Sequence, residues 1–172
     1  PLLYKNMGVD GIKTGFLTVE RYSLASSMKV GKRRITAVGS GFNTKNTRSR
    51  QSARMLNFGL RRFDTINIAL KNEPIASLNV WLGKKNKVDV VVSEDLYFTV
   101  PKRKKNTIKA FVEFEGPIKA PIRKGDVLGK LNVYISGDLK KEINILSNED
   151  IKRANIFSRL FKSFNYLIWG DV

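Results

Sequence analysis

Short runs of β-branched and aromatic residues, repeated from Thr65 to residue 147, constrain the fold of this 172-residue chain more than any other feature. Gly, Pro, Asn or Asp separates one run from the next at intervals of about 8 to 12 residues. The runs are TINIAL, ASLNVWLG, KVDVVVS, LYFTVP, IKAFVEFEG, DVLGKLNVYISG and KKEINIL. This pattern predicts a small all-β sandwich over residues 65–147.

A mixed pattern precedes that region. Residues 22–30 and 32–42 alternate loosely on either side of Gly31, which predicts a hairpin, and the segment GIKTGF before them adds a third antiparallel strand. Apolar residues at helical spacing within 49–63 predict a helix that packs on this sheet and ends near Phe63. Ser49 or Thr47 is available as its N-cap. Residues 1–64 are therefore expected to form an α+β remnant, antiparallel strands plus a packed helix.

The last part of the chain changes again. The sequence SNED at 147–150 has the form of a capping box, and it predicts an amphipathic helix over 148–172. Basic residues flank its apolar stripe, so we expect it to lie in a membrane interface rather than cross the bilayer. The alternative is a helix whose stripe packs on the sandwich. The expected anchor residues are Phe157, Leu160, Phe161, Phe164, Leu167, Ile168 and Trp169.

Composition narrows the chemistry. Lys and Arg number 32 against 15 acidic residues, and the resulting charge of +17 attracts polyanions such as nucleic acid, anionic lipid or acidic polymers. The Lys-rich pieces KKNK (84–87) and KRKK (102–105) fall between predicted strands, where we expect solvated turns. With no Cys and no His, the sequence excludes a disulfide framework, a thiolate nucleophile and a Ser-His-Asp triad. Neither a phosphate-binding glycine loop nor a metal-ligand cluster is present, so no cofactor is expected.

The stretch VDGIKTGF at 9–16 is the strongest candidate for a binding site. A peptide can lie antiparallel along such a strand, because Gly15 puts no side chain in its way. Lys13 supplies a cation and Thr14 a directional donor at the same edge, a combination that suits a terminal carboxylate. Three residues alone are a weak signal, and an ordinary surface strand is the alternative.

The chain resembles the serine-type D-alanyl-D-alanine carboxypeptidases, the low-molecular-mass penicillin-binding proteins of the S11 peptidase family. The resemblance runs through VDGIKTGF, YSLASS, RRITAVGSGF and RSRQSARMLNFGLRRFDTI, and continues in VWLGKKNKVDV, EDLYFTVPKRKK and IKAPIRKGDVLGKLNVY. The final FSRLFKSFNYLIWG is similar to that family's amphipathic anchor. It implies the end of a catalytic domain at 1–64, a membrane-proximal β-domain at 65–147 and an anchor at 148–172.

The resemblance also implies roles for individual residues. In the family, the lysine of K-T-G supports the catalytic hydrogen-bond network, and the threonine binds the terminal carboxylate of the peptidoglycan stem peptide; these roles pass to Lys13 and Thr14. Gly15 keeps the strand open to substrate, the N–H of Phe16 contributes to the oxyanion hole, and Arg48 helps to hold the carboxylate. β-Lactams are the implied inhibitors. The implied location is the periplasmic face of the bacterial inner membrane, after export.

The family's nucleophile lies in an S-x-x-K box upstream of K-T-G, with an S-x-N box between them. We therefore expect this chain to be a C-terminal portion that is inactive alone. Ser26 to Lys29 does spell S-x-x-K, but on a strand the two residues point to opposite faces, so Ser26 is not expected to be a nucleophile. The S-x-N matches at Ser77 and Ser163 are interpreted as chance.

Two other readings remain open. Lys residues interleaved with aromatic ones would suit a basic nucleic-acid-binding β-module. Against it, Trp81, Tyr97 and Phe98 lie inside alternating strands, where we expect burial. A non-catalytic scaffold at a membrane surface is the other alternative.

Overall fold

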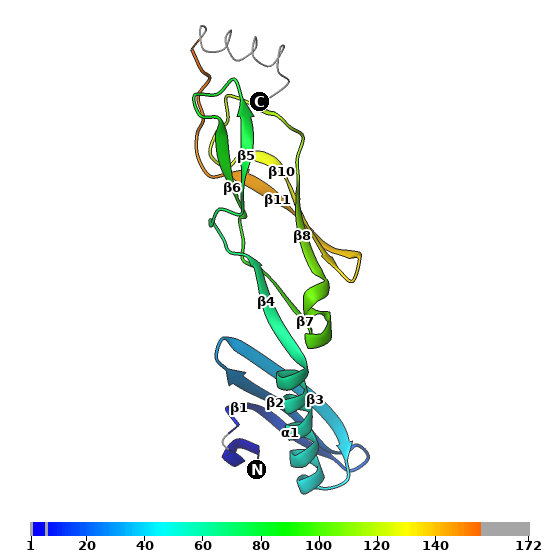
Figure 1. Ribbon diagram of the computed structural model, residues 1–172. Helices are drawn as coiled ribbons and strands as arrows, with labels where there is room; N and C mark the ends of the chain where they lie inside the picture. Colours follow the sequence, from blue (N-terminus) through cyan, green and yellow to red (C-terminus); the bar gives the residue numbers. More distant parts are fainter. Residues whose placement is uncertain (1, 6, 156–172) are drawn as a thin grey trace. The chain divides into compact units, whose positions relative to one another are not determined.

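The computed structural model describes residues 2–5 and 7–155, which form two compact units (Figure 1). The first unit contains Pro1–Thr65 and Thr99–Arg103, and the second contains the remainder. Strands β4 (Phe63–Ala69) and β7 (Leu96–Pro101) pair as a two-stranded sheet, through which the chain passes from one unit to the other and back.

The first unit is built on a three-stranded antiparallel sheet in the order β1-β2-β3. It comprises β1 (Val9–Leu17), β2 (Arg21–Val30) and β3 (Arg33–Phe42), preceded by the short 3-10 helix η1 (Leu2–Lys5). Gly31 has a φ of +59° in the two-residue turn between β2 and β3, a conformation that glycine adopts readily. The predicted hairpin and third strand are confirmed.

Helix α1 (Lys45–Arg62) packs on this sheet through Ala53 and Leu56, which form a core with Leu24 and Met28 of β2. Its N-cap is Thr44, whose Oγ1 accepts a hydrogen bond from the Thr47 N–H at 3.0 Å. The predicted caps, Ser49 and Thr47, are therefore wrong. The first turn faces solvent and has no apolar residue to mark its start, so the apolar periodicity began one turn too late.

The second unit is all-β, as predicted, but its main sheet differs from the expected sandwich. A single six-stranded sheet runs in the order β8-β10-β11-β6-β5-β9, and it curls so that one face encloses the core. Alternation within a strand gives the same pattern whether a second sheet or a curled continuation covers the buried face. The strands are β5 (Ala76–Trp81), β6 (Lys87–Val91), β8 (Ile108–Glu113), β9 (Ile118–Lys119), β10 (Val127–Ile135) and β11 (Asp138–Ser147).

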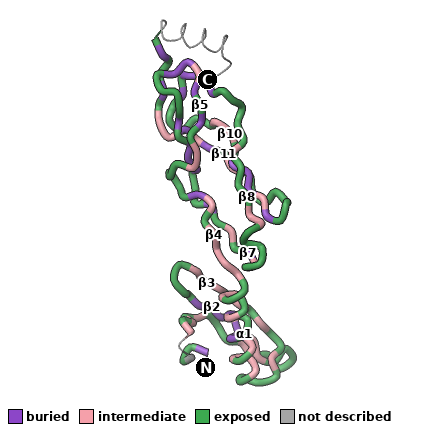
Figure 2. Tube along the Cα trace, viewed as in Figure 1, coloured by how far each residue is buried: buried purple, intermediate pink, exposed green. Residues whose placement is uncertain are grey.

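Burial follows the predicted alternation in most of the second unit (Figure 2). Both Lys-rich segments are exposed, as expected: residues 84–87 span the connection before β6 and the first residue of that strand, and 102–105 lie in the 3-10 helix η2 (Lys102–Thr107). Trp81 and Phe98 are half-buried, and Tyr97 is 60% exposed. The expected burial of Tyr97 is wrong, because its position in β7 faces away from the core residues Leu96 and Val100.

The described part of the tail is extended rather than helical. Ser147 is the last residue of β11, and its hydroxyl donates to the Glu149 carbonyl at 2.6 Å instead of capping a helix. Ile151 is 2% exposed, and its backbone N–H and C=O pair with those of Ile122 at 2.8 and 2.9 Å. The predicted helix is therefore wrong for 148–155. The seven predicted anchor residues, Phe157 to Trp169, lie outside the described residues.

Candidate functional site

Strand β1 is an edge strand, so the segment Ile12 to Phe16 runs extended along a border of the sheet. Its only strand partner among the described residues is β2, with Lys13 opposite Ala25, Thr14 opposite Leu24 and Gly15 opposite Ser23. The backbone groups on the other side of β1 are then available to an added strand.

A groove of about 920 Å³ lies beside this border. It brings together three of the predicted site residues, Lys13 and Thr14 of β1 with Arg48 of the first turns of α1. Leu2 and Leu3 of η1 complete its apolar part, and Ser26 of β2 also lines it. Lys13 and Thr14 are both exposed, so a cation, a hydroxyl and a guanidinium from two elements line one concave surface.

Phe16 and Gly15 do not line this groove, but Phe16 is connected to Arg48 through a residue that the sequence analysis missed. The Phe16 and Tyr22 rings are 4.8 Å apart between centroids, and the Arg48 guanidinium carbon lies 5.6 Å from the centre of the Tyr22 ring. The Tyr22 ring thus orients Arg48 by a cation–π contact. The sequence carries no motif for this contact, because the place of Tyr22 opposite Phe16 depends on the register of β1 with β2.

Gly15 makes room for a neighbouring side chain. A Cβ at this position would clash with the Ser23 hydroxyl oxygen, so that hydroxyl packs directly against the strand. Since Ser23 is the cross-strand partner of Gly15, the small residue keeps this side of the K-T-G segment flat.

A polar tie across the sheet fixes the start of β1. Arg34 of β3 donates to both carboxylate oxygens of Asp10, at 2.8 and 2.7 Å, and to the Ser27 hydroxyl of β2 at 2.7 Å. These hydrogen bonds and the charge of Arg34 lower the pKa of Asp10, and the carboxylate in turn raises the pKa of Arg34. The tie joins all three strands just before the K-T-G segment begins.

Of the chance motifs, only the S-x-x-K match has a serine that lines the groove among the described residues, and that serine is buried. Ser26 is buried on β2, and its hydroxyl donates to the Ala37 carbonyl at 3.2 Å, whereas Lys29 is exposed. The prediction that Ser26 and Lys29 lie on a strand is confirmed. This strand was the reason for not expecting Ser26 to be a nucleophile. Ser77 lies on β5 in the second unit, and Ser163 lies outside the described residues.

Residues 2–5 and 7–155 contain neither a membrane-spanning helix nor a metal-ligand cluster. No helix there combines the length and the apolar content needed to cross a bilayer. Nor does that part of the chain gather three or more Asp, Glu, His or Cys side chains as a metal site.

The matching family and the relatives named below agree with one another. The family described as penicillin-binding protein 5, C-terminal domain, matches residues 63–153. D-alanyl-D-alanine carboxypeptidase DacF of Bacillus subtilis is 32% identical over 154 residues, and DacA of Escherichia coli K12 is 30% identical over 161 residues. These alignments cover 89% and 92% of this chain but 40% of each relative.

Solved structures give the same result. Penicillin-binding protein 5 from Haemophilus influenzae superimposes with a TM-score of 0.67 at 29% identity, covering 87% of this chain and 44% of that one. D-alanyl-D-alanine carboxypeptidase DacD from Francisella tularensis superimposes with a TM-score of 0.61 at 26% identity, covering 89% and 38%. The chain therefore belongs to the family described as penicillin-binding protein 5, C-terminal domain, which it carries at residues 63–153, and most of its length is similar to part of proteins named D-alanyl-D-alanine carboxypeptidase.

Proposed function

We propose that the chain supplies one wall of the active-site cleft, and the β-domain, of a serine carboxypeptidase that removes the terminal D-alanine from peptidoglycan stem peptides. The observation that carries this proposal is the open border of β1, where Lys13, Thr14 and Arg48 line one groove. An extended peptide can pair with that border, and its C-terminal carboxylate then meets a hydroxyl and two cations.

The proposed reaction proceeds in two steps. A serine outside this chain attacks the carbonyl carbon of the penultimate D-alanine, the peptide bond breaks, and the leaving nitrogen takes a proton to give free D-alanine. Water then attacks the acyl-serine ester, which releases the shortened peptide and restores the serine hydroxyl. The backbone N–H of Phe16 donates to the oxyanion that forms in each step.

Each side chain has a distinct part in this proposal. Thr14 donates its hydroxyl proton to the substrate carboxylate, and Arg48, oriented by the Tyr22 ring, adds a charge-assisted contact. Lys13 supports the hydrogen-bond network around the attacking serine. β-Lactams present a similar carboxylate and carbonyl, so the same wall would receive them as inhibitors.

We also propose that the protein acts at the periplasmic face of the inner membrane, held there by residues 156–172. Because Ile151 and Ala154 are buried in the second unit, an interfacial segment has to begin beyond Asn155. A surplus of Lys and Arg near an anionic leaflet adds about 1 kcal/mol per residue to such binding. The basic nucleic-acid-binding alternative gains no support from the relatives named above.

The proposal is tested by D-alanine release from a peptide that ends in D-Ala-D-Ala. We expect turnover by the intact protein encoded with this chain and none above background by the 172-residue chain alone, since a binding wall without a nucleophile leaves only residual stabilisation. Absence of D-alanine release by a folded intact protein, or turnover by the 172-residue chain, would overturn the proposal.

A further inference from the structure

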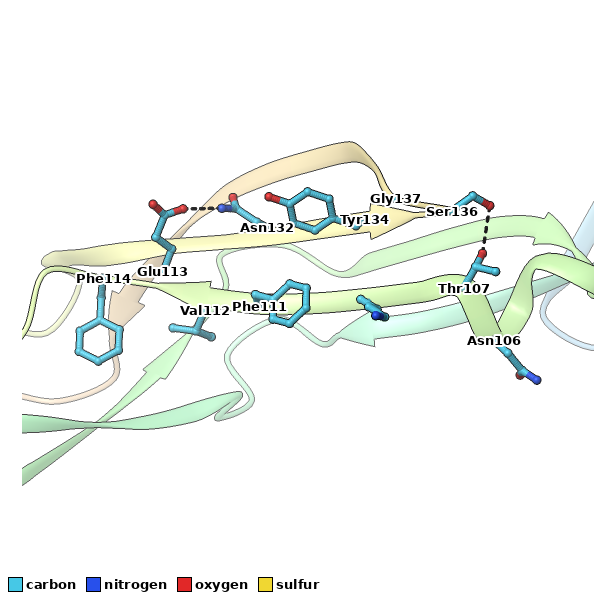
Figure 3. A pocket seen from close by; sticks show the side chains of 11 residues that line it. Asn106, Thr107, Phe111, Val112, Glu113, Phe114, Asn132, Tyr134, Ser136 and Gly137 are labelled. Atoms are coloured by element: carbon cyan, nitrogen blue, oxygen red, sulfur yellow. Dashed lines mark hydrogen bonds between the residues drawn. The ribbon is translucent and has the colours of Figure 1, made fainter.

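The face of β8 and β10 that points away from the core carries a second groove, of about 900 Å³. Register places its residues in cross-strand pairs, with Phe111 opposite Asn132 and Lys109 opposite Tyr134. Figure 3 shows these strands side by side, with the bonded pair Glu113 and Asn132 toward one end and the pair Thr107 and Ser136 toward the other. All of the lining belongs to the second unit, so this groove is separate from the border of β1.

Aromatic side chains form the middle of this groove. Phe111 is 54% exposed, and its ring meets the Tyr134 ring edge to face at 5.9 Å between centroids. Phe114, also exposed, lines the same groove. Large rings left open on a sheet face, beside convergent polar groups, are typical of a ligand site rather than of a solvated surface.

Asn132 gives the groove an unused acceptor. Its side chain is buried, with 6% exposed, and its Nδ2 donates to a Glu113 carboxylate oxygen at 2.6 Å. No donor among the described residues bonds to its Oδ1. Buried amide oxygens are nearly always paired, so a ligand N–H or O–H is the partner that this atom lacks. Phe111, which is 54% exposed, is the cross-strand neighbour of Asn132.

The charge of the groove selects against polyanions. One cation, Lys109, and one carboxylate, Glu113, line it, so it is neutral within a chain that carries +17 overall. The hydroxyls of Thr107 and Ser136, 3.2 Å apart, can both donate and accept. A neutral ligand with many hydroxyls fits this lining better than a phosphate chain or an anionic lipid.

We propose that this groove binds a neutral oligosaccharide built from N-acetylated amino sugars. The flat C–H face of a pyranose ring packs on Phe111 and Tyr134, the acetamido N–H donates to Asn132 Oδ1, and ring hydroxyls meet Thr107 and Ser136. The glycan chains to which stem peptides are attached are the natural source of such a ligand. That assignment of the source rests on the proposed function, whereas the ligand chemistry rests on the groove alone.

The test is a titration of the full chain, followed by NMR of its backbone amides, with the N-acetylglucosamine hexamer as the probe. We expect shifts confined to residues 106–114 and 130–137 at about millimolar concentrations, and binding at least about tenfold weaker for the glucose hexamer, which lacks the acetamido groups. Phe111→Ala is expected to weaken binding by at least about tenfold. Tyr97→Ala removes another exposed ring, outside the groove, and should leave binding unchanged.

Three results would overturn the proposal. They are no shifts at about 10 mM hexamer, equal binding of the two hexamers, or unchanged binding by a folded Phe111→Ala variant. Strand β8 is also a sheet edge, so an extended peptide is the alternative ligand. If a peptide, but not the sugar, protects the β8 amides from hydrogen exchange, the groove is a peptide site and the proposal is wrong. The titration measures binding and not turnover, so its result is independent of whether the intact protein releases D-alanine.

Discussion

Replacing Lys13 with alanine in the intact protein is expected to slow acylation by a labelled penicillin by about 10²- to 10⁴-fold. Lys13 is exposed on the edge strand, in the groove that Thr14 and Arg48 also line, and no side chain in that groove other than Arg48, Lys45 and Arg50 could replace its charge. Those three cations project from α1, not from the strand on which the substrate is proposed to lie. The rate is measured by gel fluorescence against time at limiting penicillin.

The matched control for Lys13 is Lys29→Ala, which removes an exposed lysine from the neighbouring strand β2 outside the groove. Its acylation rate should remain within about twofold of the unchanged protein. Both positions are exposed, so neither variant is expected to unfold. A Lys13→Ala protein that acylates as fast as the Lys29→Ala control would show that the lysine of β1 has no part in the reaction.

Replacing Ile151 with alanine is expected to lower the free energy of unfolding of the second unit by about 2 to 5 kcal/mol. The side chain is fully buried in the core of that unit, and the surrounding strands can close only part of the cavity that its loss creates. Urea unfolding of the full chain, followed by tryptophan fluorescence, measures the change.

Leu139→Ala is the matched control for Ile151→Ala, and a shortened chain tests the proposed anchor. Leu139→Ala shortens a half-exposed side chain in the same unit and should change the free energy of unfolding by less than about 0.5 kcal/mol. A chain that ends at Asn155 keeps most of the positive charge, so we expect it to unfold like the full chain but, in salt that screens surface charge, no longer to sediment with anionic vesicles. An Ile151→Ala chain as stable as the Leu139→Ala chain would contradict the extended packing, and full vesicle binding by the shortened chain would contradict the proposed anchor.

Local patterns predicted the first unit well because its strands and helix are contiguous. Alternation around Gly31 was enough for the hairpin, and the K-T-G segment followed as the next strand out. The N-cap was missed for a local reason: residues 43–49 are rich in side chains that can cap, and only the observed Thr44 to Thr47 bond distinguishes them.

Errors in the second unit came from contacts between segments that are distant in sequence. The capping-box pattern at Ser147 could not reveal that Ile151 pairs with Ile122, and this pairing keeps the chain extended past β11. Likewise, the order of the six strands, and hence the curl that replaces the sandwich, depends on pairings such as that of β11 with β6. The β-propensity of individual residues does not indicate which strands pair with one another.

Some residues of the candidate groove could be named from the sequence, whereas their contacts could not. A motif match identified Lys13, Thr14 and Arg48, and the fold places all three in one groove. The contact of Tyr22 with both Phe16 and Arg48, and the packing of Ser23 against Gly15, required the strand register. The groove around Asn132 gave no motif at all, because its residues converge only when β8 and β10 pair.

The central claim is that Thr14, on the open border of β1, recognises a terminal carboxylate. It is tested most directly in the intact protein, by comparing kcat/KM for a peptide that ends in D-Ala-D-Ala with that for the same peptide ending in a carboxamide. We predict that the preference for the carboxylate falls by about 10- to 100-fold in Thr14→Val, which keeps the side-chain shape but removes the donor. An undiminished preference in a folded Thr14→Val protein would contradict the account.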